Sequence, residues 1–401
     1  MLKGKTTVLG VSGSIAAYKM ANVASMLVKL GADVHVIMTA NATNFINPIT
    51  FETLTGNKCL VDTFDRNFQF NVAHVSLAHR ADIFLIAPAT ANVIGKLACG
   101  IADDMLTTTV MASTCPKYIA PAMNTNMYNN PVNRDNMNRL SMYGYHMIDT
   151  ASGRLACGDV GEGKLPPEEV LVDHILREIA CEKDMAGIKV TVTAGPTCEP
   201  IDPVRYITNH SSGKMGYAVA RRAMLRGADV TLISGRTSID PPPFVNVVDV
   251  YSADDMYHAV LDAFPGSDLV IKAAAVADYT PADVADEKIK KTDGDMSIKL
   301  KRTRDILSHL GASKSDRQVI CGFSMETRDL LENSKKKLDS KKADMIAANN
   351  LRDSGAGFQT DTNALTLISH DGIEKLDTMP KEQAADILLD RLMKIYREKN
   401  R

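Results

Sequence analysis

The sequence predicts an α/β protein with two consecutive doubly wound domains, Rossmann-like or flavodoxin-like, whose sheets are mostly parallel. Near the amino terminus a strand, a turn of small residues, a helix and a second strand follow one another, and this order implies parallel pairing. The same order starts again after residue 187. A chain of 401 residues is also long for one domain and comfortable for two. We therefore expect domains over residues 1–183 and 188–401.

The first turn of the chain suits a phosphate. It lies between a buried strand at residues 7–11 and a helical apolar period over residues 15–30. Gly13 and Ser14 would offer backbone N–H groups and a hydroxyl at a helix N-terminus. The full Gly-x-Gly-x-x-Gly fingerprint of dinucleotide sites is absent, and the second strand ends in Thr39 where such sites have an acid. FMN therefore fits better than NAD, and a tight turn without ligand is the alternative.

Three polar segments of the first half predict chemistry. Residues 120–128 carry two Met and two Asn, and an amide there can bind a carboxylate or a flavin edge while Met covers a flat ring. His74 precedes a buried strand at residues 82–87, and Cys157 lies in the Gly-rich loop 152–163, where a thiol can donate a proton or act as a nucleophile. An ordinary loop, a surface His and a chance Cys are the alternatives. We expect the fold to bring these segments together.

The strand at residues 82–87 is followed by Pro88, Ala89 and Thr90. Small and polar residues at the carboxyl end of a parallel strand lie where open α/β sheets bind ligands. We therefore expect this segment to border the same site as the first turn.

In the second half a long polar loop, residues 195–216, separates the first strand from its helix, and such loops are usually functional. Residues 211–214, Ser-Ser-Gly-Lys, resemble a phosphate-binding loop without its full frame. Asp278 ends a later strand, and basic clusters follow at residues 288–291 and 335–342. Together they suit a nucleoside triphosphate with Mg²⁺, although each charge run alone could be a solvated face.

The overall composition excludes several classes of protein. Hydrophobic residues make up 45%, charged residues 23% and the net charge is −2, so nothing indicates a nucleic-acid or membrane partner. The seven Cys form no Cys-x-x-Cys pair, which favours reduced thiols in a cytoplasm over disulfides or a zinc knuckle. No apolar run reaches transmembrane length, and the first residues lead into a strand without a signal peptide. We expect a cytoplasmic protein.

The order and spacing of these motifs resemble the bifunctional phosphopantothenoylcysteine decarboxylase/phosphopantothenate–cysteine ligase family of coenzyme A biosynthesis, over essentially the whole chain. Two departures stand out: Tyr128 stands where the family usually has Trp, and Arg304 where it has Pro. The residues that carry the resemblance are 13–16, His74, 87–92, 121–127 and 156–158 in the first half, and 209–216, 274–279, 288–291 and 322–323 in the second.

For the first domain, the resemblance implies an FMN-dependent decarboxylase. FMN oxidises the thiol of 4′-phosphopantothenoylcysteine, carbon dioxide leaves, and the returned hydride gives 4′-phosphopantetheine. His74 would deprotonate or position the thiol, Asn124 and Met127 would bind the carboxylate, and Cys157 would donate the final proton. The implied FMN-binding residues are Gly13, Ser14, Ile15, Thr39, Pro88, Ala89, Thr90, Asp104 and Met123.

For the second domain, the resemblance implies a CTP-dependent ligase. The carboxylate of 4′-phosphopantothenate attacks the α-phosphate of CTP, and the amine of cysteine then displaces CMP from the acyl-cytidylate. Asn209 would polarise the acyl-cytidylate and Lys288 would neutralise developing phosphate charge, while Mg²⁺, whose ligands stay unknown, accompanies CTP. The implied contact residues are Ser212, Ala273, Ala274, Asp278, Lys290, Asp305, Ile306, Leu307, Phe323, Lys337 and Lys341.

The resemblance also implies a homo-oligomer, with decarboxylase trimers forming a dodecamer and dimeric ligase domains, and small molecules as the other partners. Two rival hypotheses are a nicotinamide-dependent oxidoreductase and a non-catalytic flavoprotein that regulates a phosphatase. The missing fingerprint and Thr39 disfavour the first. His74, Asn124, Cys157 and the attached second domain disfavour the other.

Overall fold

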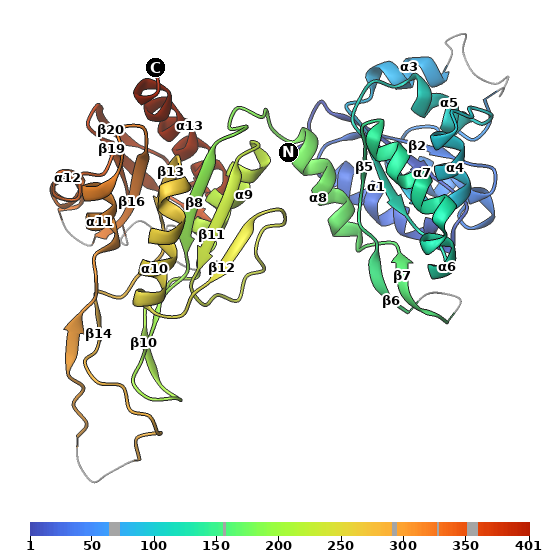
Figure 1. Ribbon diagram of the computed structural model, residues 1–401. Coiled ribbons are helices and arrows are strands. Elements are labelled where there is room, and N and C mark those ends of the chain that lie inside the picture. The colour runs from blue at the N-terminus through green and yellow to red at the C-terminus, as the bar shows by residue number, and fades with distance from the viewer. Residues whose placement is uncertain (64–72, 155–157, 291–294, 327–328, 351–359) are drawn as a thin grey trace. The chain divides into compact units, whose positions relative to one another are not determined.

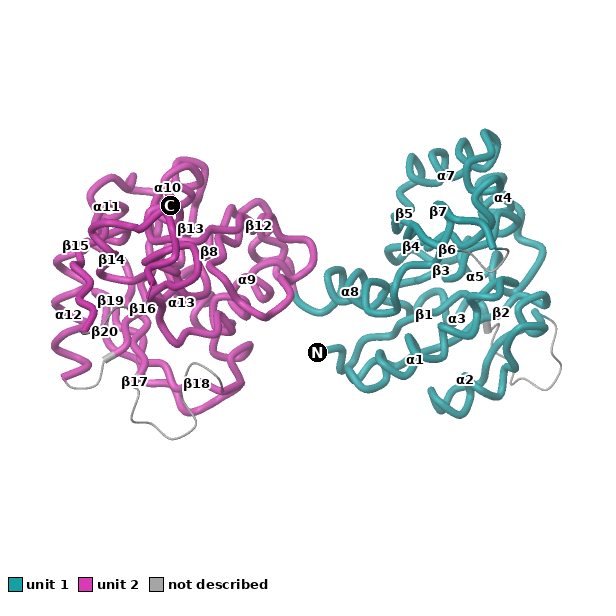
Figure 2. Tube along the Cα trace, turned by 90° about the horizontal axis from the view of Figure 1, so that it is seen from below, with its two compact units in different colours: residues 1–181 teal, residues 182–401 magenta. Residues whose placement is uncertain are grey.

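The computed structural model describes residues 1–63, 73–154, 158–290, 295–326, 329–350 and 360–401 (Figure 1). Cys157 lies outside the described residues. The chain divides into two compact units, Met1–Cys181 and Glu182–Arg401 (Figure 2). Both are α/β, and the prediction of mostly parallel sheets is confirmed. Among the described helices, none is long and apolar enough to cross a bilayer.

Unit 1 is built on a five-stranded sheet in the order β2-β1-β3-β4-β5. All neighbouring strands are parallel, which matches the flavodoxin-like winding. The predicted end of the strand at residues 82–87 is wrong. The observed strand β3 continues through Pro88 and Ala89, which were expected to follow the strand. The strands are β1 (Thr6–Val11), β2 (Asp33–Met38), β3 (Ile83–Ala89), β4 (Lys117–Pro121) and β5 (Tyr145–Met147).

Helices cover both faces of this sheet. Val8, Phe84 and Ile119 point to one face, where they form a buried cluster with α3, α4, α5 and α7, while α1 packs beside α2 and α8. The first helix opens with a 3₁₀ turn capped by Ser14. The elements are η1 (Ile15–Lys19), α1 (Met20–Lys29), η2 (Ala42–Asn44), α2 (Pro48–Thr55), α3 (Ala73–Arg80), α4 (Ala91–Ala98), α5 (Met105–Ala112), α6 (Thr125–Asn129), α7 (Pro131–Met142), α8 (Glu168–Ile179), and the hairpin β6 (Ala151–Arg154) with β7 (Val160–Lys164).

Unit 2 contains an eight-stranded sheet in the order β12-β11-β8-β13-β16-β17-β19-β20. The strands from β12 to β17 are parallel, and β19 and β20 extend the sheet antiparallel. Taken in chain order, the parallel strands follow the Rossmann order 3-2-1-4-5-6, so the winding reverses between β8 and β13. The strands are β8 (Lys189–Ala194), β11 (Asp229–Ser234), β12 (Asn246–Asp249), β13 (Leu269–Lys272), β16 (Val319–Glu326), β17 (Met345–Asn350), β19 (Leu365–Ser369) and β20 (Gly372–Lys375).

Two short antiparallel ribbons, β9–β10 and β14–β15, extend from one end of this sheet (Figure 1). Their strands are β9 (Cys198–Pro200), β10 (Tyr206–Thr208), β14 (Tyr279–Pro281) and β15 (Leu300–Arg302), and a further pair joins β18 (Thr362–Asn363) to β21 (Met379–Pro380). The helices are α9 (Lys214–Leu225), α10 (Ala253–Ala263), η3 (Phe264–Gly266), α11 (Ile306–Ser313), α12 (Leu330–Ser340) and α13 (Lys381–Lys399).

Candidate active sites

In unit 1 the ends of β1 and β3 are tied together by Ser12. Its Oγ donates to the carbonyl of Pro88 at 2.6 Å, and the Thr90 backbone N–H donates to the same Oγ at 3.0 Å. The two strands are neighbours whose following helices leave in different directions. The bonds therefore fix the two turns that border the switch point, where open sheets of this order bind ligands.

The turn after β1 fits a phosphate-bearing group. A Cβ on Gly13 would lie 2.6 Å from the Cβ of Asn41, so only glycine leaves this backbone unobstructed. Ser14 begins η1 and accepts a hydrogen bond from the Ala16 N–H at 3.4 Å. Thr39, beside them at the end of β2, has a buried hydroxyl without a hydrogen-bond partner. A buried polar atom of this kind is rare in a folded protein and indicates a missing ligand or water.

A cavity of about 370 Å³ opens beside this turn. It brings together four predicted residues, Ser14, Ile15, Met123 and Asn124. Ile15 and Tyr18 on its wall are each 57% exposed, which is unusual for large apolar side chains lining a cavity. The remaining lining residues are Ala16, Lys19, Ala122, Arg154, Gly163, Lys164 and Leu165.

Asn124 holds the loop and the β6–β7 hairpin together. It caps α6 by accepting from the Asn126 N–H at 2.8 Å, and its Nδ2 donates to Asp159 at 2.8 Å. The Thr125 hydroxyl donates to the Glu162 carbonyl at 2.8 Å, which fixes β7 against the same loop. Met127, on α6, is 49% exposed. The hairpin is therefore anchored on the Asn124 loop.

The structure does not bring His74 to Asn124 within one chain. His74 lies on α3, and α3 and α6 are at opposite ends of unit 1 (Figure 1). Asp104, also expected near FMN, is engaged elsewhere: it caps α5 and pairs with Lys96 at 3.1 Å. Burial acts to raise the pKa of Asp104, but hydrogen bonds from Thr107 and the Lys96 charge lower it below its usual value.

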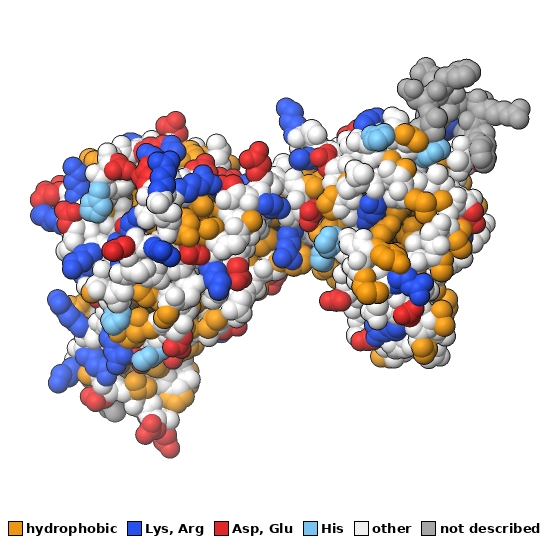
Figure 3. Space-filling model, turned by 45° about the horizontal axis from the view of Figure 1, so that its top comes forward, with side chains coloured by type: hydrophobic (Ala, Val, Ile, Leu, Met, Phe, Trp, Pro, Cys, Tyr) orange, Lys and Arg blue, Asp and Glu red, His pale blue; other side chains and the backbone are white. Residues whose placement is uncertain are grey.

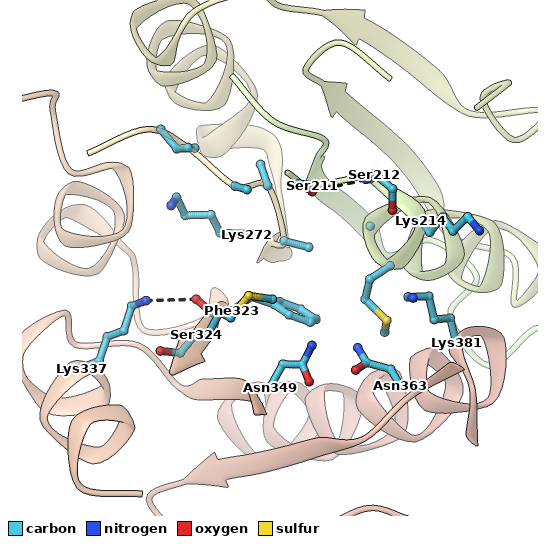
Figure 4. Close-up of a pocket in the computed structure, with 18 of the residues that line it drawn as sticks. Ser211, Ser212, Lys214, Lys272, Phe323, Ser324, Lys337, Asn349, Asn363 and Lys381 are labelled. Carbon is cyan, nitrogen blue, oxygen red and sulfur yellow. Dashed lines mark hydrogen bonds between the residues drawn. The ribbon is translucent and has the colours of Figure 1, made fainter. Parts of the chain in front are cut away.

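In unit 2 a cavity of about 290 Å³ lies at the switch point between β8 and β13 (Figure 4). Residues 211–216, at the start of α9, form one wall, and a Cβ on Gly216 would lie 2.6 Å from the Cβ of Ala194, so α9 packs closely on β8. Four lysines line it: Lys214, Lys272, Lys337 and Lys381. The other lining residues are 273–276, Asp278, 323–325, Asn349 and Asn363. This cavity suits a polyanion.

A second cavity, of about 380 Å³, shares a wall with the first. Lys272, Val276, Asp278, Phe323 and Lys337 line both. The second adds Ala277, Tyr279, residues 302–307 and Lys341, so the predicted residues Asp278, Asp305, Ile306, Leu307, Phe323, Lys337 and Lys341 all meet here.

An ion pair lies in this second cavity. Asp305 caps α11 and forms an ion pair with Lys341 at 2.8 Å. Burial would raise the pKa of Asp305, but Lys341 and the Ser308 N–H lower it. Lys337 donates to the Phe323 carbonyl at 3.1 Å. Arg304, at the departure from the family pattern, lies with its guanidinium 4.9 Å from the ring centroid of Tyr257.

Asn209, Lys288 and Lys290 lie outside the residues that line the two cavities. The amide of Asn209 donates to the carbonyl of Ala275, a wall residue of the first cavity, at 3.0 Å, so Asn209 is at its rim. Lys288 and Lys290 are exposed and flank Ile289. The Ile289 N–H donates to the buried carboxylate of Asp202 at 3.2 Å.

Asp202 also accepts from the backbone N–H groups of Val204 and Arg205 at 2.8 Å each. Burial opposes ionisation, but these bonds and the one from Ile289 lower the pKa of Asp202 to about 2. An ionised Asp202 therefore joins the loop after β9 to the segment that carries Lys288.

The sequence analysis missed six residues of the first cavity, namely Ser324, Met325, Lys272, Asn349, Asn363 and Lys381. Figure 4 shows the last three on one side and Lys272 with Lys337 on the other. The buried Oδ1 of Asn349 has no hydrogen-bond partner. Lys272 and Asn349 could have been found from the sequence, because a polar residue ends an apolar run at residues 269–272 and at residues 345–350. Within the described parts of the chain, no group of three or more His, Cys, Asp or Glu side chains could hold a metal ion.

Comparison with known proteins identifies the family. The flavoprotein family model matches residues 1–180, and the model of the DNA/pantothenate metabolism flavoprotein C-terminal domain matches residues 185–396. The "Coenzyme A biosynthesis bifunctional protein CoaBC" of Bacillus subtilis (strain 168) is 46% identical over 398 residues, covering 98% of this chain and 97% of that protein. The protein of the same name from Escherichia coli (strain K12) is 41% identical over 403 residues, covering 100% and 99%.

A solved structure described as the C-terminal domain of coenzyme A biosynthesis bifunctional protein CoaBC matches 53% of this chain and 98% of its own, with 40% identity and a TM-score of 0.46. The two full-length relatives confirm the resemblance that the motifs predicted. The chain belongs to the family of coenzyme A biosynthesis bifunctional proteins CoaBC.

Proposed function

We propose that this chain carries out two consecutive reactions. Unit 2 joins 4′-phosphopantothenate to cysteine with CTP, and unit 1 decarboxylates the product to 4′-phosphopantetheine with FMN. One observation carries the proposal: each unit has, at the carboxyl edge of its sheet, a cavity lined by residues of the family motifs. We propose that the chain works in the cytoplasm, and the lack of a disulfide among the six described cysteines supports this.

In unit 1, Gly13, Ser14 and Thr39 would hold the FMN phosphate, since they offer an unobstructed turn and an unpartnered hydroxyl. FMN, when bound, supplies oxidation of the substrate thiol and return of the hydride. Met123 would cover the flat ring. The Asn124 amide, now bonded to Asp159, would exchange that carboxylate for the carboxylate of the substrate.

The decarboxylase site would be completed by assembly. His74 and Asn124 lie on helices at opposite ends of unit 1 (Figure 1), while large apolar side chains stand exposed at the cavity, namely Ile15 and Tyr18. On the face drawn in Figure 3, hydrophobic side chains gather on unit 1. Such patches mark protein contacts. We therefore propose that His74 of one subunit serves the Asn124 loop of another, in trimers that form a dodecamer, with dimeric ligase units.

In unit 2 the first cavity would take the triphosphate, because Ser212 and the start of α9 lie among four lysines. The second would take the nucleoside between Asp278 and Asp305. Mg²⁺ would arrive with CTP, with phosphate oxygens as its main ligands and the Asn349 Oδ1 available as another. Asn209 at the rim would hold the acyl carbonyl, and Lys288 and Lys290 would approach from their exposed segment.

The test is to incubate the purified chain with 4′-phosphopantothenate, cysteine, CTP and Mg²⁺ and to follow the products by mass spectrometry. We expect condensation with cysteine first and loss of carbon dioxide afterwards. Omitting CTP should stop both, and adding 4′-phosphopantothenoylcysteine should restore only the second. A colourless protein that forms no amide would contradict the proposal for both units.

The assembly is tested separately by co-expressing the inactive variants His74→Asn and Asn124→Asp. Mixed oligomers should regain part of the decarboxylase activity, because some contacts then join an intact His74 to an intact Asn124. A mixture that stays inactive although the subunits co-purify would show that both residues must come from one chain.

A further inference from the structure

Lys272 occupies the centre of the carboxyl edge of the unit 2 sheet. It is the last residue of β13, and the two neighbouring strands are both parallel to it, pairing it with Thr193 of β8 and Gly322 of β16. It therefore lies at the switch point, on the wall between the two cavities. The only other lysine among the lining residues that borders both cavities is Lys337.

The two shared lysines differ in their partners. Lys337 donates to the Phe323 carbonyl at 3.1 Å (Figure 4). Among the described residues, none forms a hydrogen bond or an ion pair with the ammonium of Lys272. Of the two carboxylates whose charges act on Lys272, Asp305 and Asp278, the first is already paired with Lys341 at 2.8 Å. Lys272 is thus a partly buried cation that forms no ion pair with the described residues.

The surrounding charges explain its acidity. Burial, together with the positive charges of Lys337 and Lys341, lowers the pKa of Lys272 to about 8, against the opposing effect of Asp305 and Asp278. An anion placed beside Lys272 would favour its charged form and would be bound more tightly while the lysine is protonated.

We propose that Lys272 is a catalytic residue of the first ligase half-reaction, and that its ammonium contacts the α-phosphate of CTP. This rests on the proposed function of unit 2. With the β- and γ-phosphates in one cavity and the nucleoside in the other, the α-phosphorus lies at their junction, where Lys272 stands.

The step needs a cation at that junction. A carboxylate oxygen of 4′-phosphopantothenate forms a bond to the α-phosphorus, and the bond from that phosphorus to the bridging oxygen breaks. Pyrophosphate leaves with the bonding electrons, and no proton is transferred. Negative charge grows on the oxygens around the α-phosphorus, and a fixed cation in a water-poor site stabilises it more than it stabilises the ground state.

The test measures pyrophosphate release from CTP and 4′-phosphopantothenate with cysteine omitted. Lys272→Met keeps most of the side-chain volume and removes the charge, so kcat should fall about 100–1000-fold, with a smaller change in KM for CTP. Lys189→Met is the matched control, because this exposed lysine is at the amino end of the neighbouring strand β8, and its rate should be unchanged.

The pH profile separates a charge effect from a packing effect. In the wild type, kcat/KM for CTP should fall as pH rises through about 8, because Lys272 loses its proton there. Lys272→Arg keeps its charge in this range, so its residual activity should show no such fall.

Each outcome is decisive. A Lys272→Met enzyme with wild-type kcat, or a Lys272→Arg enzyme with the wild-type pH profile, would overturn the role of Lys272. A wild-type enzyme that releases no pyrophosphate would instead refute the proposed ligase function. If Lys272→Met fails to fold, the Lys272→Arg profile still decides.

Discussion

The two units begin alike and then diverge. Gly31-Ala32-Asp33-Val34 leads into β2, and Gly227-Ala228-Asp229-Val230 leads into β11, each the second strand in chain order of its unit's main sheet. Both units have a cavity at the carboxyl edge of the sheet. They differ in the first connection, which is a tight turn at residues 12–14 in unit 1 and a long connection at residues 195–213 in unit 2. The sequence analysis expected a loop there, but the structure folds part of it into the β9–β10 ribbon. The winding thus fixes where a ligand binds, and the loops fix which ligand.

The residues that line the cavities differ between the two units in a way that suits different ligands. Ile15, Tyr18 and Met123 border the cavity of unit 1, which suits a flat ring, whereas four lysines border the first cavity of unit 2, which suits a polyphosphate. Unit 2 also assembles most of its predicted contact residues within one chain, while unit 1 leaves His74 apart from Asn124. Under the proposed function, we therefore expect the ligase site to be nearly complete within one chain and the decarboxylase site to depend on assembly.

We expect the largest effect from Lys288→Gln, which should reduce the activity of unit 2 alone. Lys288→Gln removes a charge that should neutralise the α-phosphate as CTP is attacked, so pyrophosphate release should fall about 100–1000-fold. Decarboxylation of added 4′-phosphopantothenoylcysteine should be unchanged. Lys299→Gln, another exposed lysine of the same unit, is the control. Equal losses in both activities would break the separation of the two units.

Asn209→Asp should separate the two half-reactions within unit 2. In the proposed mechanism the amide at the cavity rim would hold the acyl carbonyl as cysteine attacks, a contact whose loss would cost about 100-fold. The variant should still release pyrophosphate in the absence of cysteine, yet form the amide slowly, so acyl-cytidylate should accumulate in mass spectra. Absence of pyrophosphate release from this variant would reverse the order of roles of Asn209 and Lys288.

Asp202→Asn should act through position alone. The variant keeps the oxygen that accepts from the backbone of Val204 and Arg205. It replaces the oxygen that accepts from the Ile289 N–H and from the Arg205 guanidinium with an NH2 group, which cannot accept. Because a displacement near 1 Å can cost about 100-fold, we expect the ligase kcat/KM to fall by up to about that factor. Hydrogen exchange should become faster in the segment around residue 289. Slower ligation without faster exchange would contradict this reading of Asp202.

The fold could be predicted because its signals are local. Apolar strands alternating with helical periods need no knowledge of distant residues, and the polar residues after each strand indicated the carboxyl edge. The end of β3 was missed because a strand that finishes in Pro88 and Ala89 looks like a turn in the sequence.

The candidate sites could be predicted only in part, because they depend on which strands become neighbours. Lys272 lies in the site because β13 pairs with β8. The paired residues Lys272 and Thr193 are 79 positions apart along the chain, so the sequence does not show that they are neighbours. Asn349 became a wall residue because β17 joins the same edge. For His74, the sequence order suggested proximity to Asn124, but α3 and α6 lie at opposite ends of the unit.

A glycine substitution tests whether the short turn of unit 1 binds the flavin. Gly13→Val would place side-chain atoms against Asn41, since a Cβ alone would lie 2.6 Å from the Cβ of that residue. Overpacking of this kind costs about 1–3 kcal/mol, so FMN affinity, measured by fluorescence titration, should fall about tenfold or more. Gly95→Ala is the control, because its Cβ would meet only Asn136 at 3.7 Å. Unchanged affinity in Gly13→Val would remove the turn from the flavin site.

The smallest effect concerns an ion pair at the beginning of unit 2. Asp184 pairs with Arg226 at 2.6 Å, and this contact lowers the pKa of the Asp184 carboxyl despite the opposing effect of burial. A folded pKa below the unfolded value of about 3.9 stabilises unit 2 above that pH, and this contribution is lost as pH falls through the folded pKa. Asp184→Asn should therefore lower the free energy of opening of α9 and α13 by about 1 kcal/mol at pH 7.

The difference between Asp184→Asn and the wild type should begin to shrink as the pH falls below about 4 and should vanish below the lowered pKa of folded Asp184, where the wild-type carboxyl is neutral as well. Hydrogen exchange of peptides from α9 and α13, corrected for intrinsic rates, measures it, and Asp240→Asn, at an exposed loop position, is the control. A difference that stays constant down to pH 3 would show that Asp184 acts through hydrogen-bond geometry and not through charge. In either case FMN binding should not change, because Asp184 and both helices belong to the ligase unit.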